Sequence, residues 1–188
     1  MRHWQLLVTE RYAVRSQGGS LVLLGDGVKV AKEAEYIPGV KKLHQESENS
    51  GKAPRIFGHH FGVVGIMAGG MEKLSCIPVA AELHEGATAL RKLQGKEPPK
   101  VSGIEKITVT TLMAKLLSTV ASNVTEPCVA VLDAYFAVAP VFAVAKSLCQ
   151  EDGKRQLHII TRAKSNLIGH SMASSKVDFF LYPVGQEV

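Results

Sequence analysis

The chain has 188 residues, of which 46% are hydrophobic and 21% are charged, and its formal net charge is +5. This composition is typical of one ordinary globular domain that is large enough to bury its own core. No apolar run approaches the roughly 18 residues of a membrane-spanning helix, and the first residues do not form a signal peptide, so we expect no membrane partner. Three scattered cysteines without a CxxC pair favour reduced thiols in the cytoplasm and argue against a cysteine zinc site.

The hydrophobic pattern predicts helices and strands in a defined order. Apolar, β-branched runs bounded by glycine and proline are typical of strands, and apolar residues at helical spacing are typical of helices. The strands are expected over residues 21–24, 57–68, 74–81, 128–133 and 157–161. The helices are expected over residues 1–16, 87–93, 102–122 and 138–149. The third of these helices has capping-box spacing between Ser102 and Glu105, and residues 28–56 are expected to form a long arm with little regular structure.

This order of elements predicts an α/β fold with a mixed sheet. Three strands in succession are typical of an antiparallel meander, and the strand–helix–strand–helix–strand series that follows is typical of parallel pairing. A mixed five-stranded sheet of that order, flanked by helices, is the ribonuclease H-like arrangement. We therefore expect a helical lead-in over residues 1–16, a ribonuclease H-like domain over residues 17–168, and an irregular tail over residues 169–188.

Two aspartates are the candidate functional residues. Asp26 is expected at the end of the first strand and Asp133 at the end of the fourth. Those two strands are neighbours in a mixed sheet of this order, so both carboxylates would lie at one place. Adjacent carboxylates repel each other unless a cation neutralises them, and Mg²⁺ prefers such oxygen ligands. Each aspartate alone is also compatible with a turn residue at a strand end, but the paired placement favours a site for Mg²⁺ or Mn²⁺.

Several short segments, in order along the chain, are more specific together than any one of them. They are LGDG at 24–27, KE at 32–33, PGVKKLHQES at 38–47, FGHHFG at 57–62, VLDAYF at 131–136 and ITRAKSN at 160–166. Over roughly residues 15–168 this set resembles the catalytic domain of a bacterial insertion-sequence DDE transposase. The resemblance implies a ribonuclease H-like fold in which three acids bind divalent metal and carry out catalysis. By position, Asp26 and Asp133 match the first two acids, and the third is not identified in this sequence.

The resemblance also implies a function and its partners. It implies divalent-metal-dependent DNA cleavage and strand transfer, with transposon ends and target DNA as partners and a homodimer in the full-length form. The location would be the bacterial cytoplasm, at the nucleoid when the protein is bound to DNA. Cations in the arm and after the last strand are the candidate nucleic-acid-binding residues, with a solvated surface as the alternative for each: Lys29, Lys32, Lys41, Lys42, Arg162 and Lys164.

Other kinds of site are less favoured by the sequence. The abrupt start and end suggest a truncated copy, so a nucleic-acid-binding remnant without catalysis is the main alternative. His59 and His60 are adjacent strand residues that face opposite sides and are poorly placed to bind one metal ion. There is no phosphate-binding GxxxxGK[ST] loop and no G-x-S-x-G nucleophile turn. A small-molecule α/β enzyme is disfavoured because no glycine-rich turn joins a strand to a helix.

Overall fold

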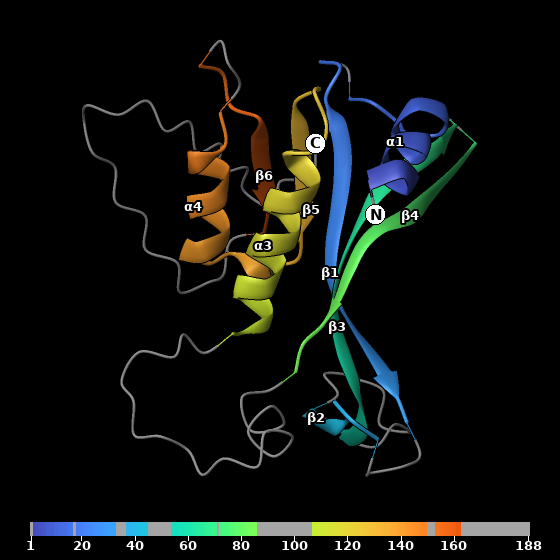
Figure 1. Cartoon of the computed structure of the whole chain (residues 1–188), viewed down its shortest axis with the longest axis vertical. Coiled ribbons are helices and arrows are strands. Elements are labelled where there is room, and N and C mark those ends of the chain that lie inside the picture. Colours follow the sequence, from blue (N-terminus) through green and yellow to red (C-terminus); the bar gives the residue numbers. More distant parts are fainter. Residues whose placement is uncertain are drawn as a thin grey trace, which may run out of the picture.

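The computed structural model describes residues 2–16, 18–32, 37–44, 54–70, 72–85, 107–149 and 153–162. These residues form a mixed α/β structure in which helices pack on an open six-stranded sheet (Figure 1). The helix predicted over 87–93, the predicted tail over 169–188 and Lys164 lie outside the described residues. No helix in the described part of the chain is long and apolar enough to cross a membrane.

The described helices and strands follow one another along the chain in the predicted order, with one strand added. The strands are β1 (Leu21–Ala31), β2 (Lys41–His44), β3 (Arg55–Gly70), β4 (Lys73–Leu83), β5 (Cys128–Leu132) and β6 (Leu157–Thr161). The helices are α1 (Arg2–Arg11), α3 (Val109–Ala121), α4 (Ala139–Ser147) and the short 3₁₀ helix η1 (Ala134–Phe136). All five predicted strands are present, and β2 is an additional strand.

The sheet combines antiparallel and parallel pairing, as predicted. Along one edge, β3 pairs first with β2 and then, further along the strand, with β4. Along its other edge β3 pairs with β1, and all three pairings are antiparallel. β1 then pairs with parallel β5, and β5 with parallel β6. The predicted count of five strands is wrong because β2 adds a sixth. The pairing of β3 with β4 shifts register between Val64 and Gly65, and Gly65 pairs with Pro78, which has no backbone N–H to donate.

The helices of the described residues share one core with one face of the sheet. Alternate residues of β1, β5 and β6 are buried in this core together with apolar residues of α3 and α4. The lead-in helix α1 joins the same layer, where Val8 is buried and Gln5 Nε2 donates a hydrogen bond to the Val120 carbonyl of α3 at 2.7 Å. We call the face of the sheet that packs against the helices the helix face. Along each strand, the residues between those that point to the helix face point to the opposite face.

The predicted irregular arm is wrong at residues 28–31, 41–44 and 55–56, which belong to strands, whereas residues 33–36 and 45–53 of the arm lie outside the described residues. β1 does not close at Gly25-Asp26-Gly27 but continues to Ala31, and β3 begins at Arg55. Gly25 occupies the strand because a Cβ there would lie 2.5 Å from Leu132 Cδ2 and 2.9 Å from Met113 Sδ. The glycine thus allows close packing of β1 against its neighbours and is not a turn signal. We call the extension formed by residues 27–32, 41–44 and 55–60 the ribbon; it projects beyond the helices (Figure 1).

The helix α3 begins later than predicted. Ile107 and Thr108 are not helical, and the side chain of Thr108 accepts a hydrogen bond from the Thr111 backbone. The Thr111 hydroxyl group in turn accepts a hydrogen bond from the Thr108 backbone, which completes a capping box. The predicted start at Ser102 is therefore wrong, because a threonine pair nearer the apolar stripe satisfies the free backbone groups of the first turn.

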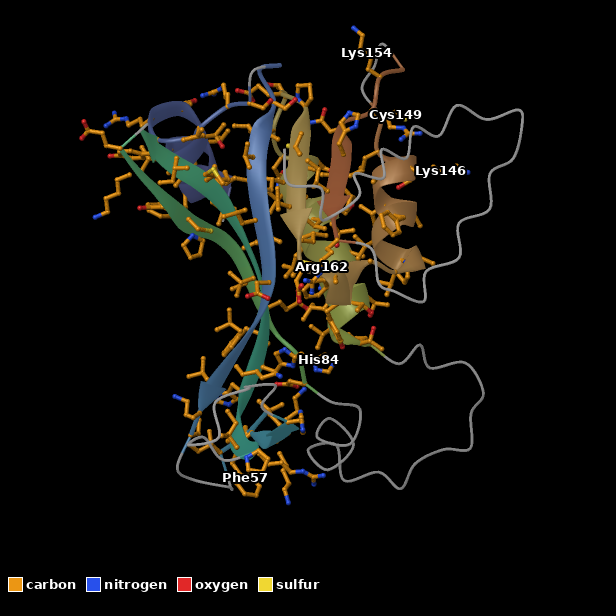
Figure 2. All side chains as sticks on the ribbon, turned by 180° about the vertical axis from the view of Figure 1, so that it is seen from behind. Phe57, His84, Lys146, Cys149, Lys154 and Arg162 are labelled. Carbon is orange, nitrogen blue, oxygen red and sulfur yellow. The ribbon has the colours of Figure 1, made fainter. Side chains whose placement is uncertain are left out.

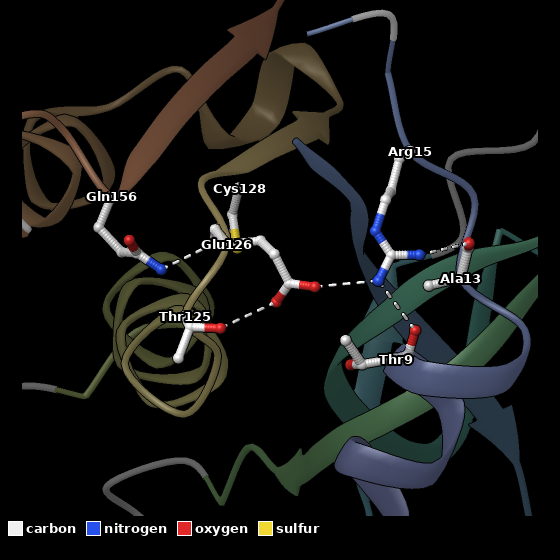
Figure 3. A network of polar contacts seen from close by, with 7 residues as sticks. All are labelled: Thr9, Ala13, Arg15, Thr125, Glu126, Cys128 and Gln156. Carbon is white, nitrogen blue, oxygen red and sulfur yellow. Dashed lines mark hydrogen bonds and ion pairs between the residues drawn. The ribbon is translucent and has the colours of Figure 1, made fainter. Parts of the chain in front are cut away.

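A polar network holds the start of β1 beside the start of β5 (Figure 3). Arg15 donates to Glu126 Oε1 at 2.9 Å and to the carbonyl of Thr9. The Arg15 hydrogen bond holds the pKa of the Glu126 carboxyl below its usual value. Buried Gln156 donates to the Glu126 carbonyl at 2.8 Å, which ties β6 to the same point. These contacts help to fix the parallel register on which the candidate site depends.

Candidate functional site

The sheet register brings the two predicted aspartates side by side. The last pair between β1 and β5 is Gly25 with Leu132, so one further residue on each strand places Asp26 beside Asp133. Asp133 keeps an extended backbone, with φ −66° and ψ 157°, which continues the strand. Asp26 lies inside β1 and not at its end, which corrects the predicted position within the strand. Asp26 nevertheless lies beside Asp133, as the order of the strands predicts.

Arg162 extends this arrangement to a third strand. β5 pairs with β6 up to Leu132 with Thr161, so the next residues, Asp133 and Arg162, are neighbours in the same way. The Thr161 hydroxyl group donates to the Asp133 carbonyl at 3.1 Å, which keeps the two strand ends together. Asp26, Asp133 and Arg162 therefore form a row across three adjacent strands, which we call the aspartate row. Figure 2 shows Arg162 close to the ends of β5 and β6.

The aspartate row lies on the face opposite the helices. Gly25 and Leu132 point into the core, and the strand residues that follow them point the other way. The side chains of Asp26, Asp133 and Arg162 are all exposed. Solvent and a large ligand can therefore approach the row without displacing the core.

Local hydrogen bonds orient both carboxylates. Asp26 Oδ1 accepts from the Gly27 backbone nitrogen at 2.7 Å, and Asp133 Oδ1 accepts from the Ala134 backbone nitrogen at 2.6 Å. Neither aspartate takes part in an ion pair within the described residues. A cation bound between carboxylates on neighbouring strands would offset the repulsion between their charges.

The donor set fits a hard divalent cation. Adjacent strands are about 4.8 Å apart, which lets two carboxylates reach one Mg²⁺ at about 2.1 Å from each bound oxygen. Mg²⁺ is commonly held by one or two carboxylates, with water and substrate phosphate completing its shell. Within the described residues no group of three or more His, Cys, Asp or Glu side chains could hold a metal ion. Binding of a metal ion by Asp26 and Asp133 stays a prediction.

The predicted DNA-binding lysines divide between the two faces of the ribbon. Strand alternation and the register put Lys32 and Lys42 on the face of the aspartates, where both are exposed. Lys29 and Lys41 point to the helix face and bind carbonyl groups of the protein itself. Lys29 Nζ donates to the His44 carbonyl at 2.8 Å, and Lys41 Nζ donates to the His84 carbonyl at 2.7 Å. DNA contact by any of them stays a prediction.

A basic cluster on the helix face was not foreseen from the sequence. Lys41 Nζ also contacts His84 Nδ1, and His84 Nε2 hydrogen-bonds to the Ile107 carbonyl at 2.9 Å. The rings of His60 and His84 lie 5.9 Å apart in an edge-to-face arrangement (His84 is labelled in Figure 2). These contacts connect β2, the end of β4 and the start of α3. No local pattern predicts them, because Lys41 and His84 are distant in sequence and the sheet brings them together.

Burial and neighbouring cations keep the cluster histidines neutral. Burial, followed by the charges of Lys41 and Lys29 and by His84, lowers the pKa of His60 to about 4. Burial also lowers the pKa of His84 and that of Lys41. His60 and His59 are adjacent in β3 and make different contacts, since His59 Nε2 hydrogen-bonds to the Pro38 carbonyl. The two rings do not form one metal site.

We expect acid to destabilise the protein through His60. Its pKa is lower in the folded state than in the unfolded state, so the unfolded state binds more protons between pH 6.5 and about 4. The contribution is fully present above pH 6.5 and is lost as the pH falls to about 4. Because the ring is half-exposed, we expect about 1 kcal/mol of unfolding free energy to be lost between pH 7 and pH 5. Urea unfolding in EDTA measures this loss.

The control for this experiment is an exposed histidine elsewhere in the sheet. His60→Gln should reduce the difference between pH 7 and pH 5, whereas His158→Gln on β6 should leave it unchanged. An unchanged pH dependence in His60→Gln would contradict a pKa of His60 lowered by burial and by the neighbouring lysines.

Comparison with models of protein families, with curated proteins and with solved structures finds no match to this chain.

Proposed function

We propose that this chain carries out divalent-metal-dependent phosphodiester chemistry on DNA, of the cleavage and strand-transfer type that DDE transposases perform. The observation that carries the proposal is the aspartate row, in which two carboxylates and one guanidinium group lie on neighbouring strands of one open face. The proposal extends to a ribonuclease H-like fold. It is supported by the order of the strands, in which the first four, β1 to β4, are joined by antiparallel pairing and the last two, β5 and β6, are added by parallel pairing.

Each residue of the row would have a separate task. Asp26 and Asp133 would hold Mg²⁺ or Mn²⁺, which activates a water molecule or a 3′ hydroxyl group and stabilises the leaving oxygen. The Arg162 guanidinium group would bind a non-bridging oxygen of the DNA phosphate, for which its fixed donor geometry is suited. Because the row is on the open face, a DNA duplex could approach both groups from the same side.

A second candidate function is DNA binding without catalysis. One observation favours it: within the described residues the row supplies two carboxylates, and no third acidic ligand joins them. This candidate keeps the phosphate-binding role of Arg162 and of the exposed lysines, and predicts salt-dependent binding. It predicts no nicking at any metal concentration.

Nicking of supercoiled plasmid DNA separates the two functions. The first predicts that Mg²⁺ or Mn²⁺ supports nicking, that EDTA abolishes it, and that Asp26→Asn or Asp133→Asn lowers the rate at least ~100-fold. The control is Glu82→Gln, which removes a carboxylate that pairs with Lys115 of α3, on the helix face. DNA binding by the wild-type chain without metal-dependent nicking would contradict the catalytic proposal and support the second function.

A further inference from the structure

A second row of side chains crosses the ribbon on the face of the aspartates. Lys42 pairs with Phe57, and the Lys32 backbone nitrogen donates to the Phe57 carbonyl at 2.9 Å. Lys32, which directly follows β1, is therefore a neighbour of Phe57 in β3, and Phe57 is a neighbour of Lys42 in β2. All three are exposed, including 38% of the Phe57 surface. We call these three residues the ribbon row; Figure 2 shows Phe57 near the far end of the ribbon.

The ribbon row and the aspartate row are on the same side of β1. Lys32 follows Asp26 by an even number of residues, so alternation along the strand gives both side chains the same face. The next residues toward the end of the ribbon on this face, His44 and Arg55, form a further exposed pair. This face thus carries carboxylates beside Asp26 and, six positions further along the chain, cations beside Lys32.

The other face of the ribbon is occupied by the protein itself. Lys29 and Lys41 bind carbonyl groups there, and His60 and His84 lie beside them. The cations that remain available for a polyanion are therefore those of the aspartate face. Four glutamates of the same arm lie outside the described residues: Glu33, Glu35, Glu46 and Glu48.

We propose that the ribbon row binds the backbone of duplex DNA that flanks the reacting phosphate. This inference rests on the proposed function. It adds that the DNA runs along β1 from the aspartate row toward the ribbon row. Six residues of extended strand separate Asp26 from Lys32, a span of about 20 Å, which equals roughly six base pairs of duplex. Lys32 and Lys42 contact phosphates of that flank, and the exposed Phe57 ring between them contacts the sugar. The twist of the ribbon suits it to follow a groove of the duplex.

The first test measures duplex DNA binding by fluorescence anisotropy in EDTA, where no metal-dependent step contributes. The double variant Lys32→Ala/Lys42→Ala should bind at least ~10-fold more weakly and should lower the slope of log Kd against log salt by about two. Phe57→Ala should weaken binding with no change in that slope.

The matched control is Lys73→Ala/Lys146→Ala, which removes the same charge at exposed positions of β4 and α4 (Lys146 is labelled in Figure 2). The control should change Kd less than twofold. Equal losses in the two double variants would overturn the proposal, because binding would then depend on net charge alone. Unchanged binding in the ribbon variant, or tighter binding of single-stranded DNA than of duplex, would also overturn it.

The second test locates the flank with nicked oligonucleotide duplexes. Extending the duplex from two to eight base pairs on one side of the nick should raise the affinity of the wild-type chain, with most of the gain by six base pairs. The ribbon variant should show no gain. DNA binding through the ribbon row without metal-dependent nicking would contradict the proposed catalytic function alone. Metal-dependent nicking with no effect of the ribbon variant on binding would contradict the ribbon proposal alone.

Discussion

Replacement of Asp133 with asparagine is expected to weaken Mn²⁺ binding at least ~100-fold without loss of fold stability. Asparagine keeps the side-chain oxygen that accepts the hydrogen bond from the Ala134 backbone, so the local structure is retained. It removes one of the two charged ligands and also the repulsion between the carboxylates. In EDTA the free energy of unfolding should therefore stay the same or rise by up to about 1 kcal/mol.

The pair of single variants gives a sharper result than either alone. If Asp26 and Asp133 bind the same ion, Asp26→Asn and Asp133→Asn should each weaken the same single binding event, and the double variant should abolish it. Isothermal titration calorimetry with Mn²⁺ measures the affinity, and thermal melting with and without metal checks it. Glu82→Gln serves as the control because its carboxylate pairs with Lys115. Two binding events in the wild-type chain, of which each single variant removes only one, would show two independent sites and would contradict a shared ion.

The neighbouring positions of Asp26 and Asp133 could be predicted because they follow from strand order. Each aspartate follows an apolar run, and the order of the elements makes those two strands adjacent. The exact register could not be predicted, because it depends on long-range contacts such as Arg15 with Glu126 and Gln156 with the Glu126 carbonyl. Such contacts join segments that are distant in the sequence, and no local pattern indicates that they meet.

The boundary of β1 was predicted wrongly for a physical reason. Glycine is a common strand breaker, so Gly25-Asp26-Gly27 favoured a turn. In the structure the two glycines point to the helix face, where Leu132 and Met113 at Gly25, and His60 at Gly27, occupy the space that side chains would fill. A glycine that permits close packing and a glycine that permits a turn are identical in a single sequence.

The division of the arm lysines between two faces follows from the same error. Once β1 and β2 are strands, alternation assigns Lys32 and Lys42 to one face and Lys29 and Lys41 to the other. A loop has no such alternation, so an irregular arm implied one undivided basic surface. The contact of Lys41 with His84 needs the tertiary fold in addition.

Replacement of Phe136 with alanine is expected to cost 3–5 kcal/mol of unfolding free energy, since truncation of a buried aromatic ring leaves a cavity that the core fills incompletely. Phe136 is 1% exposed and lies in η1, directly after Asp133. Its ring lies under the strand that carries Asp26, because Phe136 Cζ would be 3.8 Å from a Cβ at Gly27. Its backbone nitrogen also donates to the Asp133 carbonyl at 2.9 Å. The ring therefore supports both aspartates from the helix face.

The neighbouring aromatic residue provides the matched control. Tyr135 is 49% exposed, so Tyr135→Ala should cost about 1 kcal/mol or less, although its ring contacts that of Phe136. Phe136→Leu keeps most of the buried volume and should cost about 1–2 kcal/mol, which keeps the experiment quantitative if the alanine variant is unfolded. Urea unfolding in EDTA, followed by circular dichroism, measures all three variants, and Mn²⁺ titration of Phe136→Leu tests the effect on the site. Equal costs for Tyr135→Ala and Phe136→Ala would contradict the packing of Phe136 beneath the aspartate row.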